Sequence, residues 1–117
     1  SATTARLEVT NGGNFPTPPQ YVISGPIDDP AVINETTGLS IITTGVSLLE
    51  GETLFLQVRD RAARLGAADG ALRADLIDAA ATDWGDLTPG VNVLRLAGDG
   101  ISPGTTTLSA SWRHAWI

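Results

Sequence analysis

The sequence predicts an all-β protein, a sandwich or barrel of antiparallel strands with one short helix. Three observations predict this class: the strand-like segments are short, clusters of Gly, Pro, Asn and Asp separate them, and a single segment has helical spacing. The chain has 117 residues, the length of one ordinary domain. We therefore expect residues 1–117 to form a single domain.

The strand segments alternate apolar and polar residues, so one side of each is expected to face the core. In the first segment, Ala5, Leu7 and Val9 share that side. The proline-rich stretch 15–19 is expected to be extended and to run along an edge, because proline fixes its own φ and disfavours helix before it. Expected strands cover residues 5–10, 20–24, 31–35, 38–44, 52–60, 91–97 and 105–117, with a turn at 25–30 and a loop around 48–52.

The helical candidate is the segment 70–80, in which Leu72, Leu76 and Ala80 are spaced four apart. We expect one or two turns there. In the last strand the even positions from Leu108 to Trp116 share a face. Because a large aromatic side chain in mid-strand supplies core area, Trp112 is expected to be buried.

The composition excludes several function classes. The absence of Cys excludes disulfides, thiolate metal sites and cysteine nucleophiles. A net charge of -6, from thirteen acidic residues against seven arginines, disfavours nucleic-acid binding. No apolar run reaches the roughly 20 residues of a membrane-spanning helix, and residues 1–6 lack the layout of a signal peptide. We expect neither membrane insertion nor secretion.

No group of residues matches a catalytic pattern. The sole histidine, His114, has no second His or Cys with which to share a metal, and no Gly-x-Ser-x-Gly motif precedes it. The carboxylate pairs 28–29 and 50/52 lie in expected turns, where Asp and Glu commonly bond local backbone. The loop aspartates lack the spacing of a calcium loop, and the glycosylation triplet 34–36 is treated as coincidence. We expect no catalytic residue, no metal and no cofactor.

Two aromatic residues are candidates for ligand binding. Sugar rings commonly stack on exposed aromatic side chains of β-sandwiches, and Trp116, next to the chain terminus, is the tryptophan expected to be exposed. Tyr21 is the second candidate. Nearby Asp or Asn side chains in a shallow groove would be needed to bind the sugar hydroxyls.

Six fragments of the sequence, taken together, resemble one known family. They are Asn11-Gly12, Ser24-Gly25-Pro26, and residues 34–38, 51–54, 83–92 and 112–116. The chain is similar over nearly its whole length to the C-terminal domain of siphovirus distal tail proteins, which include minor tail proteins of actinobacterial phages. The most specific fragment runs from Trp84 to Asn92.

The resemblance implies a β-sandwich of galectin-like or carbohydrate-module-like shape, without enzymatic activity, at the tail tip of a virion. It implies a longer protein whose N-terminal domain forms a hexameric ring. The chain itself would be a monomer that contacts other tail or baseplate proteins or a host receptor. The alternative is a carbohydrate-binding module directed at a glycan of the bacterial cell wall. On this resemblance the expected structural residues are Trp84, Leu87, Pro89, Gly90, Asn92 and Trp112.

Three physical roles are expected within that set. Pro89 and Gly90 would form a turn, because proline and glycine favour the backbone angles that turns need. Asn92 would bond the backbone of that turn. Trp84 would close the edge of the core.

Overall fold

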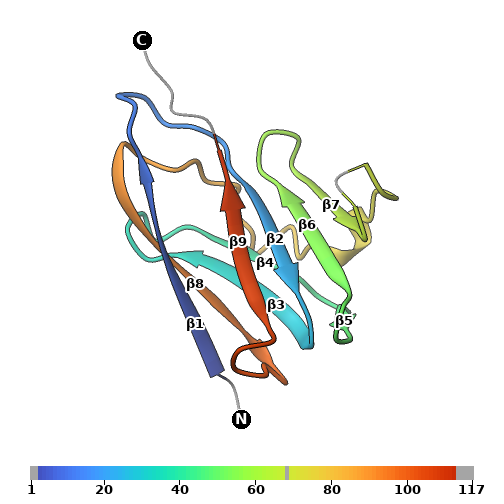
Figure 1. Cartoon of the computed structure of the whole chain (residues 1–117). Coiled ribbons are helices and arrows are strands. Elements are labelled where there is room, and N and C mark those ends of the chain that lie inside the picture. Colours follow the sequence, from blue (N-terminus) through green and yellow to red (C-terminus); the bar gives the residue numbers. More distant parts are fainter. Residues whose placement is uncertain (1–2, 68, 113–117) are drawn as a thin grey trace.

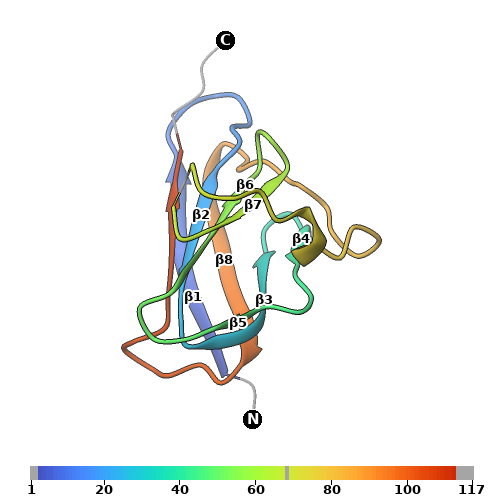
Figure 2. The same cartoon turned by 90° about the vertical axis from the view of Figure 1, so that its right-hand side faces the viewer.

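A computed structural model describes residues 3–67 and 69–112, which form two antiparallel sheets packed face to face (Figures 1 and 2). One sheet has the strand order β1-β8-β3-β4, with β5 paired to β3, and the other has the order β7-β6-β2-β9. The predicted all-β sandwich is confirmed. The elements are β1 (Thr3–Asn11), β2 (Gln20–Ser24), β3 (Ile27–Asn34), β4 (Ser40–Ile42), β5 (Ser47–Leu48), β6 (Thr53–Gln57), β7 (Ala62–Leu65), the 3-10 helix η1 (Ala74–Leu76), β8 (Gly90–Asp99) and β9 (Thr107–Ser111).

The core lies between the two sheets and is built from alternate residues of the strands. Leu54 and Leu56 of β6 and Leu94 and Leu96 of β8 have no exposed surface. Each such side chain stabilises the fold by roughly 1.5–3 kcal/mol relative to an exposed position. Val58, two residues beyond Leu56, is buried as well, so the alternation of the expected strand 52–60 places Leu54, Leu56 and Val58 on one core face, as the sequence predicts.

Several strands have other bounds than predicted, and two strands were not predicted. β4 and β6 are shorter than the expected strands 38–44 and 52–60, and β9 covers only Thr107–Ser111 of the described part of the expected strand 105–117. β3 begins at Ile27, inside the expected turn, because a register shift between Asp28 and Ala31 lets the chain bend without leaving the sheet. β5 has only two residues and pairs with β3 inside an expected loop. β7 was not predicted, because its Ala-Ala-Arg-Leu sequence has no β-branched residue, and its pairing to β6 creates the strand.

The prediction of one or two helical turns within residues 70–80 is confirmed only as the single turn η1, and of Leu72, Leu76 and Ala80 only Leu76 is buried. The backbone there bonds to sheet edges in place of its own preceding turn. Arg73 N–H donates to Ala63 O of β7 at 2.8 Å, and Asp78 N–H donates to Ile42 O of β4 at 2.9 Å. Figure 2 shows this segment beside β4. The segment covers the outer edge of β7 in one sheet and of β4 in the other, so neither edge is open to pairing with another chain.

Among the described residues, no helix is long and apolar enough to cross a membrane.

The two ends of the sandwich differ in what they carry. β1, β3, β6 and β9 finish at one end, where β2 and β8 begin, as the antiparallel pairings require (Figure 1). We call this the loop end. It carries the connections 12–19, 35–39, 58–61 and 84–89.

The sole tyrosine of the chain provides a test of this packing. Tyr21 is 2% exposed, on the same face of β2 as Ile23. Burial, and secondarily the charge of Asp86, raise the pKa of the Tyr21 phenol above its ordinary value of 10.0. The neutral phenol therefore stabilises the fold fully below pH 10.0, and that contribution is lost as pH rises above it.

We predict that the free energy of unfolding falls above pH 10.0 in the wild type and falls much less in Tyr21→Phe. The chain has no lysine and no cysteine, so arginine is the only other side chain that still carries a titratable proton above pH 10.0. The loss of stability can therefore be assigned to Tyr21. Phenolate absorbance near 295 nm, followed with circular dichroism, measures this. Phenolate formation near the ordinary tyrosine pKa in a protein that is still folded would contradict the burial of Tyr21.

Candidate functional site

The fragment 84–92 approaches β8 along the loop end and then enters it. Leu87 has no exposed surface and exchanges two backbone hydrogen bonds with Thr17, at 3.0 and 2.8 Å. Pro89 forms a bend, and Gly90 opens β8 with a φ of +92°, a conformation that L side chains rarely adopt. The predicted turn at Pro89 and Gly90 is therefore present, and glycine is required there.

Asn92 closes this turn with its side chain. It has no exposed surface, and its Nδ2 donates to the carbonyl oxygens of Thr88 at 2.8 Å and Gly90 at 3.2 Å. Its Oδ1 accepts from Thr88 N–H at 3.1 Å and from the Thr88 hydroxyl at 3.1 Å. The predicted bonding of Asn92 to the turn backbone is confirmed.

Two further buried asparagines, which the sequence did not single out for this role, complete the arrangement. Asn34 Nδ2 donates to Asn92 Oδ1 at 3.2 Å, and Asn34 Oδ1 accepts from the amides of Thr36 and Thr37. Asn11 Nδ2 donates to Phe15 O at 2.8 Å and Leu87 O at 3.3 Å. We call Asn11, Asn34 and Asn92 the asparagine cluster; their exposed fractions are 1%, 6% and 0%.

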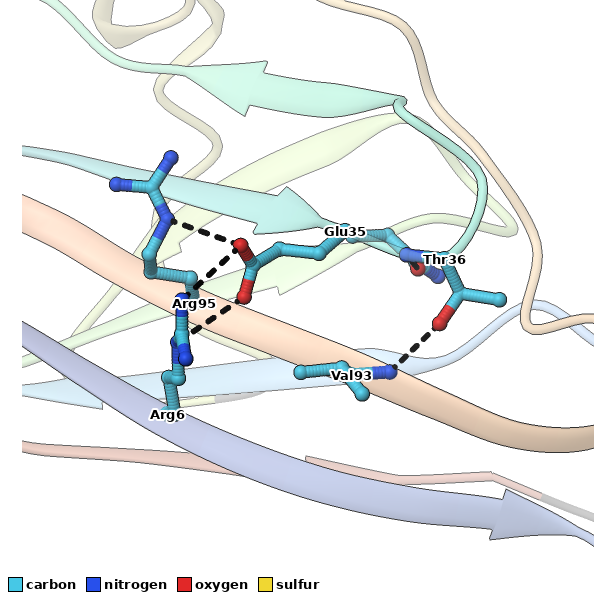
Figure 3. A network of polar contacts seen from close by, with 6 residues as sticks. Arg6, Glu35, Thr36, Val93 and Arg95 are labelled. Carbon is cyan, nitrogen blue, oxygen red and sulfur yellow. Dashed lines mark hydrogen bonds and ion pairs between the residues drawn. The ribbon is translucent and has the colours of Figure 1, made fainter.

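The residues after Asn34 extend the connection to the outer face of the five-stranded sheet (Figure 3). Val93 N–H donates to Thr36 Oγ1 at 3.0 Å, and Glu35 N–H donates to Val93 O at 2.8 Å. The Glu35 carboxylate pairs with Arg6 of β1 at 3.1 Å and lies 3.9 Å from Arg95 of β8. This network is partly solvent-exposed, so it adds little stability but links three strands.

Two sequence patterns, the glycosylation triplet 34–36 and the carboxylate pairs, have structural roles in the folded chain. Asn34 heads the glycosylation triplet, but its amide nitrogen is buried and bonded to Asn92. The expected local bonding of carboxylates is confirmed at Glu52, which accepts from Leu49 N–H. It is wrong at Asp29, which lies in β3 and accepts from Val46 N–H, 17 residues away. No group of three or more His, Cys, Asp or Glu side chains that could hold a metal occurs within the described residues.

The aromatic candidates have different outcomes. Tyr21 is buried, so its expected role as an exposed sugar-binding ring is wrong; its alternation with Ile23 places it in the core. Trp84 and Trp112 are partly buried and pack against the core. This agrees with the role expected of Trp84. The prediction that Trp112 is buried in mid-strand is only partly correct, because Trp112 follows the end of β9 and also lines a surface groove. Trp116 and His114 lie outside the described residues.

Two surface hollows lie at opposite ends of the sandwich. A groove of about 750 Å³ at the loop end is lined by Trp112, Arg59, Asp60 and the side of β2 and β6 where Gln20 and Gln57 lie. The other, of about 490 Å³, opens at the opposite end, between Val46, Leu48, Leu65, Leu76 and Arg73. Sequence reasoning missed the groove because its walls come from three separate segments, 17–20, 57–60 and 111–112.

This geometry defines a β-sandwich module whose buried polar side chains serve its own loops. A family model described as siphovirus-type tail component, C-terminal domain, matches residues 12–116. The chain belongs to this family, which confirms the resemblance in its motifs, and it is accordingly a component of the phage virion tail. Comparisons with curated proteins and with solved structures found no match.

We predict that Asn92→Ala lowers the free energy of unfolding by about 3 kcal/mol, because it removes the side-chain bonds to Thr88 and Gly90 and leaves the buried Asn34 Nδ2 without its partner. Urea denaturation measures the change. The exposed substitution Ser109→Ala is the control and should stay within about 0.5 kcal/mol. If Asn92→Ala were no more destabilising than this control, the loop end would not depend on Asn92.

Proposed function

We propose that the chain is a non-enzymatic structural and interaction domain at the tip of a siphovirus tail, presenting a surface for baseplate or host-receptor contacts. The observation that carries this proposal is the family match over residues 12–116. The geometry of the most specific motif supports it, since Asn92 and Leu87 bond or pack within the domain itself. A motif with that role maintains a scaffold and leaves the outer faces for partners.

We further propose that the chain is the C-terminal part of a longer tail protein whose N-terminal domain forms a hexameric ring. The family description, a C-terminal domain, supports this arrangement. In it the chain by itself is a monomer, and the ring provides the symmetry.

A second candidate function is binding of a cell-wall carbohydrate. The loop-end groove favours it, because Trp112 offers an aromatic surface beside the amides of Gln20 and Gln57. Carbohydrate hydroxyls need such a combination of a few directed polar groups and an apolar wall.

Immunogold labelling of intact virions tests the tail-tip location. Antibodies raised against the 117-residue chain should place gold at the distal end of the tail, and pre-incubation with the chain should remove the label. Label distributed along the tail tube, or at the capsid, would contradict the proposed location.

A further inference from the structure

Positive charge is concentrated on one hairpin of an acidic protein. Among the described arginines, Arg6 and Arg95 pair with Glu35, and Arg73 pairs with Asp75. No ion pair within residues 3–67 and 69–112 involves the other three described arginines. These are Arg59, Arg61 and Arg64, all on the β6–β7 hairpin, where Asp60 is the one acidic residue.

The outer face of the four-stranded sheet adds to this feature. Tyr21, Ile23, Leu54 and Leu56 point into the core, so the alternate residues of β2 and β6 point outward. Among the described residues, this outer face carries no carboxylate. Its side chains are hydroxyls, amides, one aliphatic group, one aromatic ring and one guanidinium: Gln20, Val22, Ser24, Thr53, Phe55, Gln57, Arg64, Thr107, Ser109 and Ser111.

Arg64 is held in place on this face by neutral groups. Its Nε donates to Gln57 Oε1 at 3.1 Å, and its Nη1 donates to Gly70 O at 2.9 Å. Gln57 Nε2 in turn donates to Gln20 Oε1 at 3.0 Å. Nη2 takes part in none of these bonds, so an oriented guanidinium donor remains on the surface. Such preorganisation lowers the entropic cost of binding an anion.

The groove continues this face toward the loop end. Gln20, Gln57 and Ser111 belong to both, and the groove adds the ring of Trp112, the guanidinium of Arg59 and the carboxylate of Asp60. The surface therefore alternates aromatic rings with directed polar groups and carries two arginines. It is open and shallow, without a deep apolar pocket for a peptide side chain.

We propose that this surface binds a polysaccharide containing uronic acid residues, with Arg59 and Arg64 contacting the sugar carboxylates and Trp112 and Phe55 contacting ring faces. The inference rests on the second candidate function and specifies its ligand. Guanidinium groups bind carboxylates with charge-assisted hydrogen bonds, and the amides match sugar hydroxyls. Sparse sugar carboxylates fit better than a dense polyphosphate, which the net charge of -6 repels.

The test is calorimetric titration of the 117-residue chain with a hexamer of galacturonic acid. Two comparison ligands are the same hexamer with its carboxyl groups reduced to alcohols, and poly(glycerol phosphate). We expect the acidic hexamer to bind at least about tenfold more tightly than either one, and to weaken as salt is raised.

Variants locate the site. Arg59→Gln and Arg64→Gln should each lower the affinity about tenfold, since each removes a charged contact. Arg73→Gln is the matched control: Arg73 lies at the other hollow, pairs with Asp75, and should leave affinity unchanged. Thermal melting shows whether each variant is folded.

Three results would overturn the proposal: no binding of the acidic hexamer, equal losses in Arg64→Gln and Arg73→Gln, or tighter binding of poly(glycerol phosphate). Equal binding of the reduced hexamer would also overturn it, because the sugar carboxylates would then contribute nothing to binding, although carbohydrate binding as the second candidate function would stand. The tail-tip location is tested separately by labelling, so it can hold while this inference fails.

Discussion

Side-chain amides of the asparagine cluster organise the loop end, and the surrounding connections depend on them. Asn92 bonds the backbone that leads into β8, Asn34 bonds the β3–β4 connection, and Asn11 bonds the segment that follows β1. An irregular connection packed against a core must pair its backbone groups, because each unpaired buried group costs roughly 1–3 kcal/mol. Three asparagines satisfy groups on three connections, and one bond joins two of the asparagines directly.

This constraint links the scaffold to the surface where binding is proposed. Leu87, held by Thr17, anchors the segment that enters the groove wall at Thr17 and continues into β2 at Gln20. The buried bonds therefore fix the starting position of β2, and its pairing with β6 and β9 positions the outer face. Because buried bonds hold the core and the loop end in place, the outward-facing residues of the sheet can differ between proteins without disturbing the core.

Much of the fold could be predicted from alternation, as in β2 and β6, where buried residues occupy every second position and polar residues begin and end each strand. β7 and the extended segment around Asp78 could not, because pairing with other strands determines their conformation. At the site, Asn92 and Thr88 are four residues apart, so their bond was predictable, whereas Asn34 and Asn92 are 58 apart. The burial of Tyr21 could have been inferred from its alternation with Ile23.

Native-state hydrogen exchange of the Thr88 amide tests the central role of Asn92 most directly. Thr88 lies outside the strands, and its N–H donates to the buried Asn92 Oδ1. We predict that it exchanges only with global unfolding, at the same free energy as the amide of Leu54 in the core. Exchange of Thr88 at the rate of an unprotected loop amide would show that the asparagine cluster does not hold the loop end together.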